Sequence, residues 1–313
     1  MSLSRSLLAL TLTATVGLAG CSANDALDVR GDQPVPKRLA RAMKAKDMAL
    51  KAPVLMRIFK EENVLEVWKQ KSNGRYALLK EYEICKYSGK LGPKIKEGDR
   101  QAPEGFYLVN RGLLNPRSSY YLSFNLGYPN RFDRSHNRTG KQLMVHGACS
   151  SAGCYAMEDE QIAEIYAIAR DALNGGQREF QVQALPFRMT AENMARHRGD
   201  PNFEFWQNLK TGYDHFELTK TPPRIEVCDR SYRFNETATE GSFVANAPCP
   251  STTTPERLAK LYANYQSGYQ LRFDAAVRKL GGEPAAPSVV TASDDAVADV
   301  NVPEGVTVEP LAN

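Results

Sequence analysis

The pattern of apolar and polar positions predicts a strand-rich first half of the chain. Segments rich in aliphatic and aromatic residues alternate there with short polar turns such as Ser72-Asn73-Gly74, as in an antiparallel meander. A loop punctuated by glycine and proline, 88–103, interrupts the strands. We predict strands at 54–59, 64–68, 76–85, 106–109, 120–124, 143–146 and 180–185.

Helical periodicity predicts a short basic helix at 37–51, a helix around 162–169 and another at 194–209. A longer helix is predicted to begin at Thr254-Pro255-Glu256, with the threonine as N-cap, and to stop at Gly281-Gly282. One face of this helix is apolar, which predicts packing rather than cofactor binding; it comprises Leu258, Leu261, Tyr262, Tyr265, Tyr269, Phe273, Val277 and Leu280.

Composition adds charge to this picture. With 42% apolar and 24% charged residues the chain can form a full core, and its mean hydropathy of −0.45 excludes a multispanning membrane protein. The last 29 residues, 285–313, hold five acidic and no basic side chains, and we expect this tail to be disordered. Because residues 1–20 carry only Arg5, the net charge of +4 leaves +8 on residues 21–284, which suits an anionic partner.

The N-terminus predicts export. Arg5 precedes an apolar stretch, 7–18, that is too short for a permanent membrane helix. The stretch ends in Leu18-Ala19-Gly20-Cys21, which resembles the lipobox of bacterial lipoproteins, where the cysteine is acylated after cleavage. An ordinary signal peptide with a chance cysteine is the alternative. We therefore expect a lipoprotein signal peptide at 1–20, lipidation at Cys21 and a tether at 21–36.

One segment combines the residue types of nucleophilic catalysis. Residues 143–157 place His146, Cys149 and Cys154 with two glycines and two serines between a predicted strand and a predicted helix. At a strand-to-helix turn, helix N–H groups would form an oxyanion hole and favour a thiolate, and a neutral imidazole would activate it. Two alternatives stay open: a structural zinc held by these three residues and Cys85, or a structural turn closed by a Cys149–Cys154 disulfide.

The same segment resembles the signature of the L,D-transpeptidase catalytic domain, the YkuD fold, in which a His-Gly pair is followed by S/T-x-Gly-Cys. The segment 98–106, GDRQAPEGF, is similar to another motif of that family. Several further segments together resemble the YafK branch of this family: 83–93, 153–157, 186–190, 205–206 and 212–214. The resemblance covers roughly 53–220 and implies an α+β fold, mainly β: an antiparallel β-sandwich with flanking helices, here followed by a C-terminal extension with one long helix. We assign 37–221 to the catalytic domain and 222–284 to the extension.

Departures from the family pattern bear on the reaction. Ala152 stands where typical members have a second histidine, Tyr155-Ala156 replaces a hydrophobic-Arg pair, and the gap between His146 and Cys154 is short. The YafK branch implies a hydrolase that cuts amide bonds at meso-diaminopimelate, including protein–peptidoglycan links. The alternatives are an L,D-transpeptidase that forms cross-links or attaches proteins to peptidoglycan, and a non-enzymatic wall-binding module.

The resemblance also suggests roles for individual residues. Cys154 is the expected nucleophile and His146 the base, with the Gly147 carbonyl orienting the imidazole. The N–H groups of Gly153 and Cys154 are candidates for the oxyanion hole, and Ser151 shapes the turn or donates one hydrogen bond at the site. Arg188, Lys86 and Tyr155 are substrate-binding candidates; for Arg188 and Lys86 a surface salt bridge is the alternative. We expect no cofactor, metal or nucleic acid. The expected partners are peptidoglycan and the proteins linked to it, and a membrane through Cys21, in the periplasm.

Cysteine parity supplies the last prediction. Removing Cys21 to the lipid leaves five cysteines in an oxidising compartment, so one thiol stays unbridged. If that thiol is Cys154, then Cys228 pairs with Cys249 in the polar segment, and Cys85 with Cys149 is the second bridge.

Overall fold

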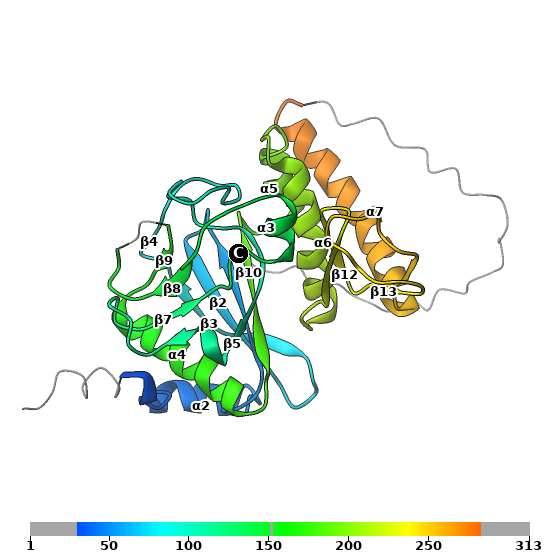
Figure 1. The fold of residues 1–313 in the computed structure, drawn as a ribbon. Helices are drawn as coiled ribbons and strands as arrows, with labels where there is room; N and C mark the ends of the chain where they lie inside the picture. Colours follow the sequence, from blue (N-terminus) through cyan, green and yellow to red (C-terminus); the bar gives the residue numbers. More distant parts are fainter. Residues whose placement is uncertain (1–29, 151–152, 283–313) are drawn as a thin grey trace, which may run out of the picture.

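Two five-stranded sheets form the body of the protein (Figure 1). The structure is a computed structural model that describes residues 30–150 and 153–282. Sheet A has the order β3-β2-β1-β10-β5, with β1 at Val54–Phe59, β2 at Val64–Gln70, β3 at Tyr76–Glu83, β5 at Gly105–Asn110 and β10 at Glu179–Leu185. Sheet B has the order β4-β9-β8-β7-β6, with β4 at Lys86–Tyr87, β6 at Leu114–Asn115, β7 at Ser123–Asn125, β8 at Met144–His146 and β9 at Tyr155–Ala156.

Most strand pairs are antiparallel, and β1-β2-β3 is the predicted meander. Each sheet also contains one parallel pair, β1 with β10 and β8 with β9. The helices are α2 (Lys37–Ala45), α3 (Arg131–Ser135), α4 (Asp159–Asn174), α5 (Ala191–Arg196), α6 (Phe203–Thr219) and α7 (Glu256–Lys279). Two small hairpins, β11-β12 and β13-β14, complete the fold; their strands are Ile225–Cys228, Ser231–Phe234, Thr237–Ala238 and Thr252–Thr253. The α+β prediction is confirmed.

Sheet A is covered on both faces, which explains why all six residues of β1 are buried. Side chains alternate across a strand, so Met56 and Ile58 face sheet B and α4 in the main core. On the opposite face Arg57 stacks on aromatic rings of α6, with its guanidinium carbon 4.3 Å from the Tyr213 ring centroid. The protein is thus layered as sheet B, sheet A and a helical layer.

The helical layer has its own core, in which α5, α6 and α7 meet the hairpin β11-β12. Tyr265, Tyr269 and Phe273 of α7 join this core, so the packing crosses the boundary predicted after residue 221. Leu261 and Leu280 were expected on the same face but are 41% and 50% exposed, because they lie at the edge of the apolar stripe and past the helix end.

The structure corrects several predicted boundaries. The helix predicted at 37–51 ends at Ala45, and the one predicted at 194–209 is two helices separated by a turn that includes Asp200 and Pro201. Pro255 itself is the N-cap of α7, in place of Thr254. The polar segment before Pro250 contains the unpredicted strand β12, whose Tyr232 and Phe234 are buried. Among the described residues, no helix has the length and apolar character needed to cross a bilayer.

Candidate active site

One face of sheet B carries the polar candidates. The register aligns Ser123 of β7 with His146, His146 with Ala156 of β9, and Ala156 with Lys86 of β4, and paired residues point to the same face. The neighbouring row, with Phe124, Val145 and Tyr155, faces the main core. Since Cys154 precedes Ala156 by two positions, strand alternation directs its side chain to the face of His146.

His146 is a buried histidine with a defined tautomer. Its Nδ1 lies 2.6 Å from the carbonyl oxygen of Gly147, which can only accept, so Nδ1 donates the proton and Nε2 is the basic nitrogen. The Tyr120 ring packs against the imidazole with centroids 4.6 Å apart. Burial lowers the pKa of His146 from its usual range, and the hydrogen bond to Gly147 opposes that shift. The imidazole is therefore neutral near pH 7.

Gly147 is needed for a close approach of three elements. A Cβ there would lie 2.5 Å from the Asp159 carboxylate and 2.9 Å from the Tyr120 carbonyl oxygen. The Gly147 amide donates to that carbonyl at 3.0 Å, and Asp159 accepts from the Ala148 amide at 2.7 Å. The loop after His146 is thereby attached to the first residue of α4.

Cys154 does not lie at the start of a helix, which corrects the predicted strand-to-helix turn. It immediately precedes β9, and α4 begins only at Asp159. Its sulfur lies 3.6 Å from the carbonyl oxygen of Gln142, to which the thiol donates. Burial raises the pKa of the thiol, and the Met144 amide and the charge of Lys94 lower it to a smaller extent. Burial thus favours a resting thiol over a thiolate.

Gly153, directly before this cysteine, has φ +143°, a conformation that side chains with a Cβ rarely adopt. Ser151 lies outside the described residues. The roles of Gly153 and Cys154 N–H groups in an oxyanion hole stay predictions.

Lys94 is a buried cation that was not among the predicted site residues. Its side chain packs against Gly140, where an added Cβ would lie 2.7 Å from its Cε, and the ammonium is ion-paired with Asp99. Asp99 also accepts from backbone amides of residues 95, 96 and 101. The motif GDRQAPEGF contains this aspartate, so the motif was a signal for the loop that positions Lys94.

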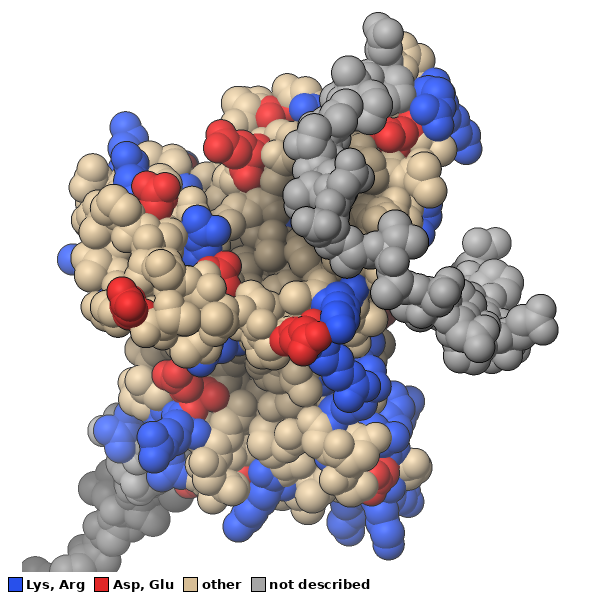
Figure 2. Space-filling view, turned by 90° about the vertical axis from the view of Figure 1, so that its right-hand side faces the viewer, with Lys and Arg blue, Asp and Glu red and all other residues tan. Residues whose placement is uncertain are grey.

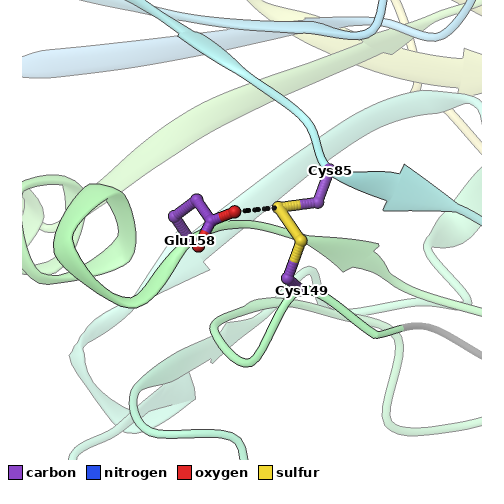
Figure 3. A group of neighbouring side chains, drawn as sticks. All are labelled: Cys85, Cys149 and Glu158. Atoms are coloured by element: carbon purple, nitrogen blue, oxygen red, sulfur yellow. Dashed lines mark hydrogen bonds between the residues drawn. A yellow bond between two sulfur atoms is a disulfide. The ribbon is translucent and has the colours of Figure 1, made fainter.

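The described cysteines other than Cys154 form disulfides, Cys85–Cys149 and Cys228–Cys249. Figure 3 shows Cys85 and Cys149 beside Glu158, whose Oε1 lies 3.4 Å from the Cys85 sulfur. Two sulfurs bonded to each other do not supply thiolate ligands, so this geometry does not fit the zinc alternative. It also excludes the Cys149–Cys154 bridge in this state. The Cys85–Cys149 disulfide joins the chain before β4 to the loop between His146 and Cys154.

Two of the three substrate-binding candidates have other roles here. The Arg188 guanidinium is paired with Glu66 and, at 2.8 Å, with Glu81 on sheet A, which is the salt-bridge alternative. Tyr155 is fully buried and donates to the Pro103 carbonyl at 2.6 Å, so it cannot contact a substrate. Lys86 is exposed at the edge of sheet B, on the face that bears His146.

A groove of about 500 Å³ is lined by Gln142 and Met144, whose backbone atoms contact Cys154, although neither Cys154 nor His146 itself lines the groove. Tyr120, which packs on His146, also lines it, and so do Asn115, Ser118, Ser119 and Asn125. This wall of hydroxyl and amide groups suits a polar, extended ligand.

Comparison with known proteins finds two relatives, both named "Putative L,D-transpeptidase YafK", from Escherichia coli strain K12 and from E. coli O157:H7. Each is 48% identical over 187 residues, which are 60% of this chain and 76% of the relative. No family model matches the chain.

Solved structures similar to the chain include the helical cell shape determining protein Pgp2 from Campylobacter jejuni, with 18% identity and a TM-score of 0.34. That match covers 61% of this chain and 80% of the other. Bd1075 from Bdellovibrio bacteriovorus has 19% identity and a TM-score of 0.33, over 56% of this chain and 76% of the other.

Proposed function

Because the chain belongs to the YafK family of L,D-transpeptidase-like proteins, we propose that it is a cysteine-dependent enzyme that hydrolyses amide bonds at meso-diaminopimelate in peptidoglycan, including those that attach proteins. The observation that carries this proposal is the shared face of sheet B. The register pairs His146 with Ala156, and Gly147 holds His146 with Nε2 as its basic nitrogen. Cys154 lies two positions before Ala156, just outside β9, and continued strand alternation would direct its side chain to the same side.

The reaction proceeds through a thioester. Nε2 of His146 takes the proton of the Cys154 thiol as the sulfur attacks the amide carbonyl of diaminopimelate. The C–N bond then breaks, and the imidazolium returns the proton to the leaving amine. Water, deprotonated by the same imidazole, cleaves the thioester and restores the thiol. Neutral resting forms of both groups, which the pKa directions support, are the forms that this proton transfer requires.

Lys94 is the candidate group for the substrate's free carboxylate. Diaminopimelate carries a carboxylate near the scissile carbonyl, and a buried ammonium recognises such a group strongly. Lys94 is close enough to Cys154 to lower the pKa of the thiol. Both cations already have carboxylate partners, Asp99 for Lys94 and two glutamates of sheet A for Arg188, so a substrate carboxylate would have to share the Lys94 ammonium with Asp99. Lys86, on the same face of sheet B, is the second candidate.

We expect the peptide part of this substrate to bind in the groove lined by Gln142 and Met144. Its amide and hydroxyl side chains, among them Asn115, Asn125 and Ser118, can hydrogen-bond the peptide groups of a stem. Tyr120 is 43% exposed and offers an apolar surface next to the base. An extended peptide would thus lie over Met144 with its acyl carbon above the thiol.

Export and lipidation belong to the same proposal. The segment Leu18-Ala19-Gly20-Cys21 supports acylation at Cys21, which lies outside the described residues, and peptidoglycan is reached only outside the cytoplasm. The two disulfides agree with an oxidising compartment. Metabolic labelling with palmitate checks the anchor, because Cys21→Ser should abolish incorporation.

L,D-transpeptidation is the second candidate, favoured by the name of the two E. coli relatives. It differs only in the acyl acceptor, an amine in place of water. The absence of the second histidine at Ala152 and the short gap between His146 and Cys154 favour water.

One experiment separates these reactions. Purified enzyme is incubated in ¹⁸O-labelled water with sacculi that carry a covalently linked protein, and the fragments are analysed by mass spectrometry. Hydrolysis releases the protein and leaves one ¹⁸O in the diaminopimelate carboxyl group. Transpeptidation gives new amide links without the label. Absence of both products, equal to the Cys154→Ala control, would refute an enzyme and leave a binding module.

A further inference from the structure

The lower end of the molecule in Figure 1, where α2 lies, is strongly basic. Residues 37–51 contain six basic side chains and one acidic one, Asp47. Within α2 the apolar Leu39 and Met43 are buried against the main core, and the first turn has no acidic residue. The remaining face exposes Lys37, Arg38, Arg41 and Lys44.

These four side chains are not used to stabilise the fold. None forms an ion pair with another residue in the part of the chain that the structure describes, whereas Lys46 donates to the Leu78 and Leu79 carbonyls. Four unpaired cations on one short helix repel one another, so the arrangement costs stability unless an anionic surface covers it.

Neighbouring segments extend the basic surface. Asp47 accepts from Ser72, which brings the turn between β2 and β3 with its exposed Arg75 beside α2. The Lys51 backbone lies against Gly175 at the end of α4, followed by the exposed Arg178. Figure 2 shows Lys and Arg gathered over this lower end. Leu50, 47% exposed, adds an apolar side chain to the same surface.

Chain length ties this surface to the proposed anchor. The described part begins at Arg30, nine residues after Cys21, and an extended chain of that length spans at most about 30 Å. A lipid on Cys21 would therefore hold the α2 end near the bilayer. Stable anchoring by acyl chains is commonly strengthened by a polybasic patch.

We propose that Lys37, Arg38, Arg41 and Lys44, with Leu50 beside them, form a docking surface for anionic phospholipid headgroups. The surface orients the enzyme with α2 on the membrane. The inference rests on the proposed function only for the anchor at Cys21, and the binding itself requires no acylation.

The test uses the mature chain, residues 21–313, carrying Cys21→Ser so that no lipid is attached. Co-sedimentation is measured with vesicles of phosphatidylglycerol and phosphatidylethanolamine and with vesicles of phosphatidylcholine alone. We expect binding only to the anionic vesicles, with loss of binding in 0.5 M salt. Because each basic side chain near an anionic surface strengthens partitioning by roughly fivefold, changing all four to Gln should weaken it at least tenfold.

A matched control removes four exposed basic side chains from α7, at the far end of the molecule in Figure 1: Arg257, Lys260, Arg278 and Lys279, each to Gln. This variant should retain binding within about twofold. Equal losses in both variants would show a net-charge effect and overturn the proposal, as would absence of binding to anionic vesicles. Salt-sensitive binding of the α2 face to isolated sacculi without binding to vesicles would assign it to the wall and also overturn it. Activity on sacculi, assayed in the same preparations, reports the proposed reaction separately.

Discussion

The ammonium of Lys60 and the carboxylate of Glu104 lie 2.9 Å apart, and neither side chain is exposed to solvent. Lys60 follows β1, and Glu104 lies at the end of the loop that carries Lys94. The ammonium also donates to the Gly92 carbonyl, and Glu104 accepts from the Trp206 indole at 2.8 Å. This ion pair thus joins the loop beside the candidate nucleophile to sheet A and to α6.

Glu104→Gln should lower the free energy of unfolding by about 3–5 kcal/mol, because it leaves the buried Lys60 charge without its counterion. Burial lowers the pKa of Lys60 and the charge of Glu104 raises it, so the variant should also release a proton from Lys60 more readily. Urea denaturation at pH 7 measures the loss. The double variant Lys60→Met, Glu104→Gln should recover part of it, and a loss below 1 kcal/mol in the single variant would contradict this role.

Cys154→Ala should abolish turnover of sacculi and covalent labelling by a carbapenem, because both need the sulfur as nucleophile. The fold should persist, since the side chain is only partly buried and Ala removes one atom. Intact-mass spectrometry measures labelling, and thermal unfolding measures stability. Labelling that survives in the variant would assign the acylated group elsewhere.

Activity should fall as pH decreases, with an apparent pKa below 6.5. Burial lowers the pKa of His146, so its basic form persists to lower pH than in an exposed histidine, and protonation then removes the base. The pH profile of kcat/KM tests this. Tyr120→Leu keeps an apolar cover on the imidazole and serves as a control whose acid limb should move little. An acid limb above pH 7 would contradict the assignment.

Asp214 should make the folded protein less stable as the pH rises from about 4 to about 6. Burial raises the pKa of this carboxyl group to about 6, and the Lys210 ammonium opposes the shift. The native state therefore binds the proton more tightly than the unfolded chain, and rising pH costs at most about 3 kcal/mol through this group. The free energy of unfolding, measured by urea denaturation at several pH values from 4 to 7, should lose this pH-dependent contribution in Asp214→Asn. The same pH dependence of the unfolding free energy in the variant and the parent protein would reject this account.

The sequence predicted the strands of sheet A well because their apolar runs are long. It failed for strands of only two residues, such as β9, since Tyr155-Ala156 has no measurable period. Because β9 was missed, Cys154 was predicted to adjoin the helix around 162–169, whereas β9 lies between Cys154 and α4. The turn between α5 and α6 was missed because apolar Met194, Phe205 and Leu209 keep near-helical spacing across Asp200-Pro201.

At the candidate site, the sequence selected His146 and Cys154 by residue type and motif, but it could not select the cation. Arg188 follows β10 and appeared suitable, whereas its partners Glu66 and Glu81 lie more than 100 positions away in the chain. Lys94 is brought to Cys154 by contacts with Gly140, again distant in sequence. Such choices depend on tertiary contacts that a single sequence does not encode locally.

Successive side chains of β1 face two different cores, so the pairing register of β1 against β2 decides which core each side chain enters. A slip of one residue against β2 would turn Met56 and Ile58 toward α6 and would carry the Arg57 charge into the apolar space between the sheets. In the native register that charge meets Glu217 and the Tyr213 ring. Mispaired forms are thus penalised by an unpaired buried cation as well as by misplaced apolar side chains. Arg57 therefore acts against the slipped register of β1, by destabilising a competing pairing as well as by its contacts in the native one.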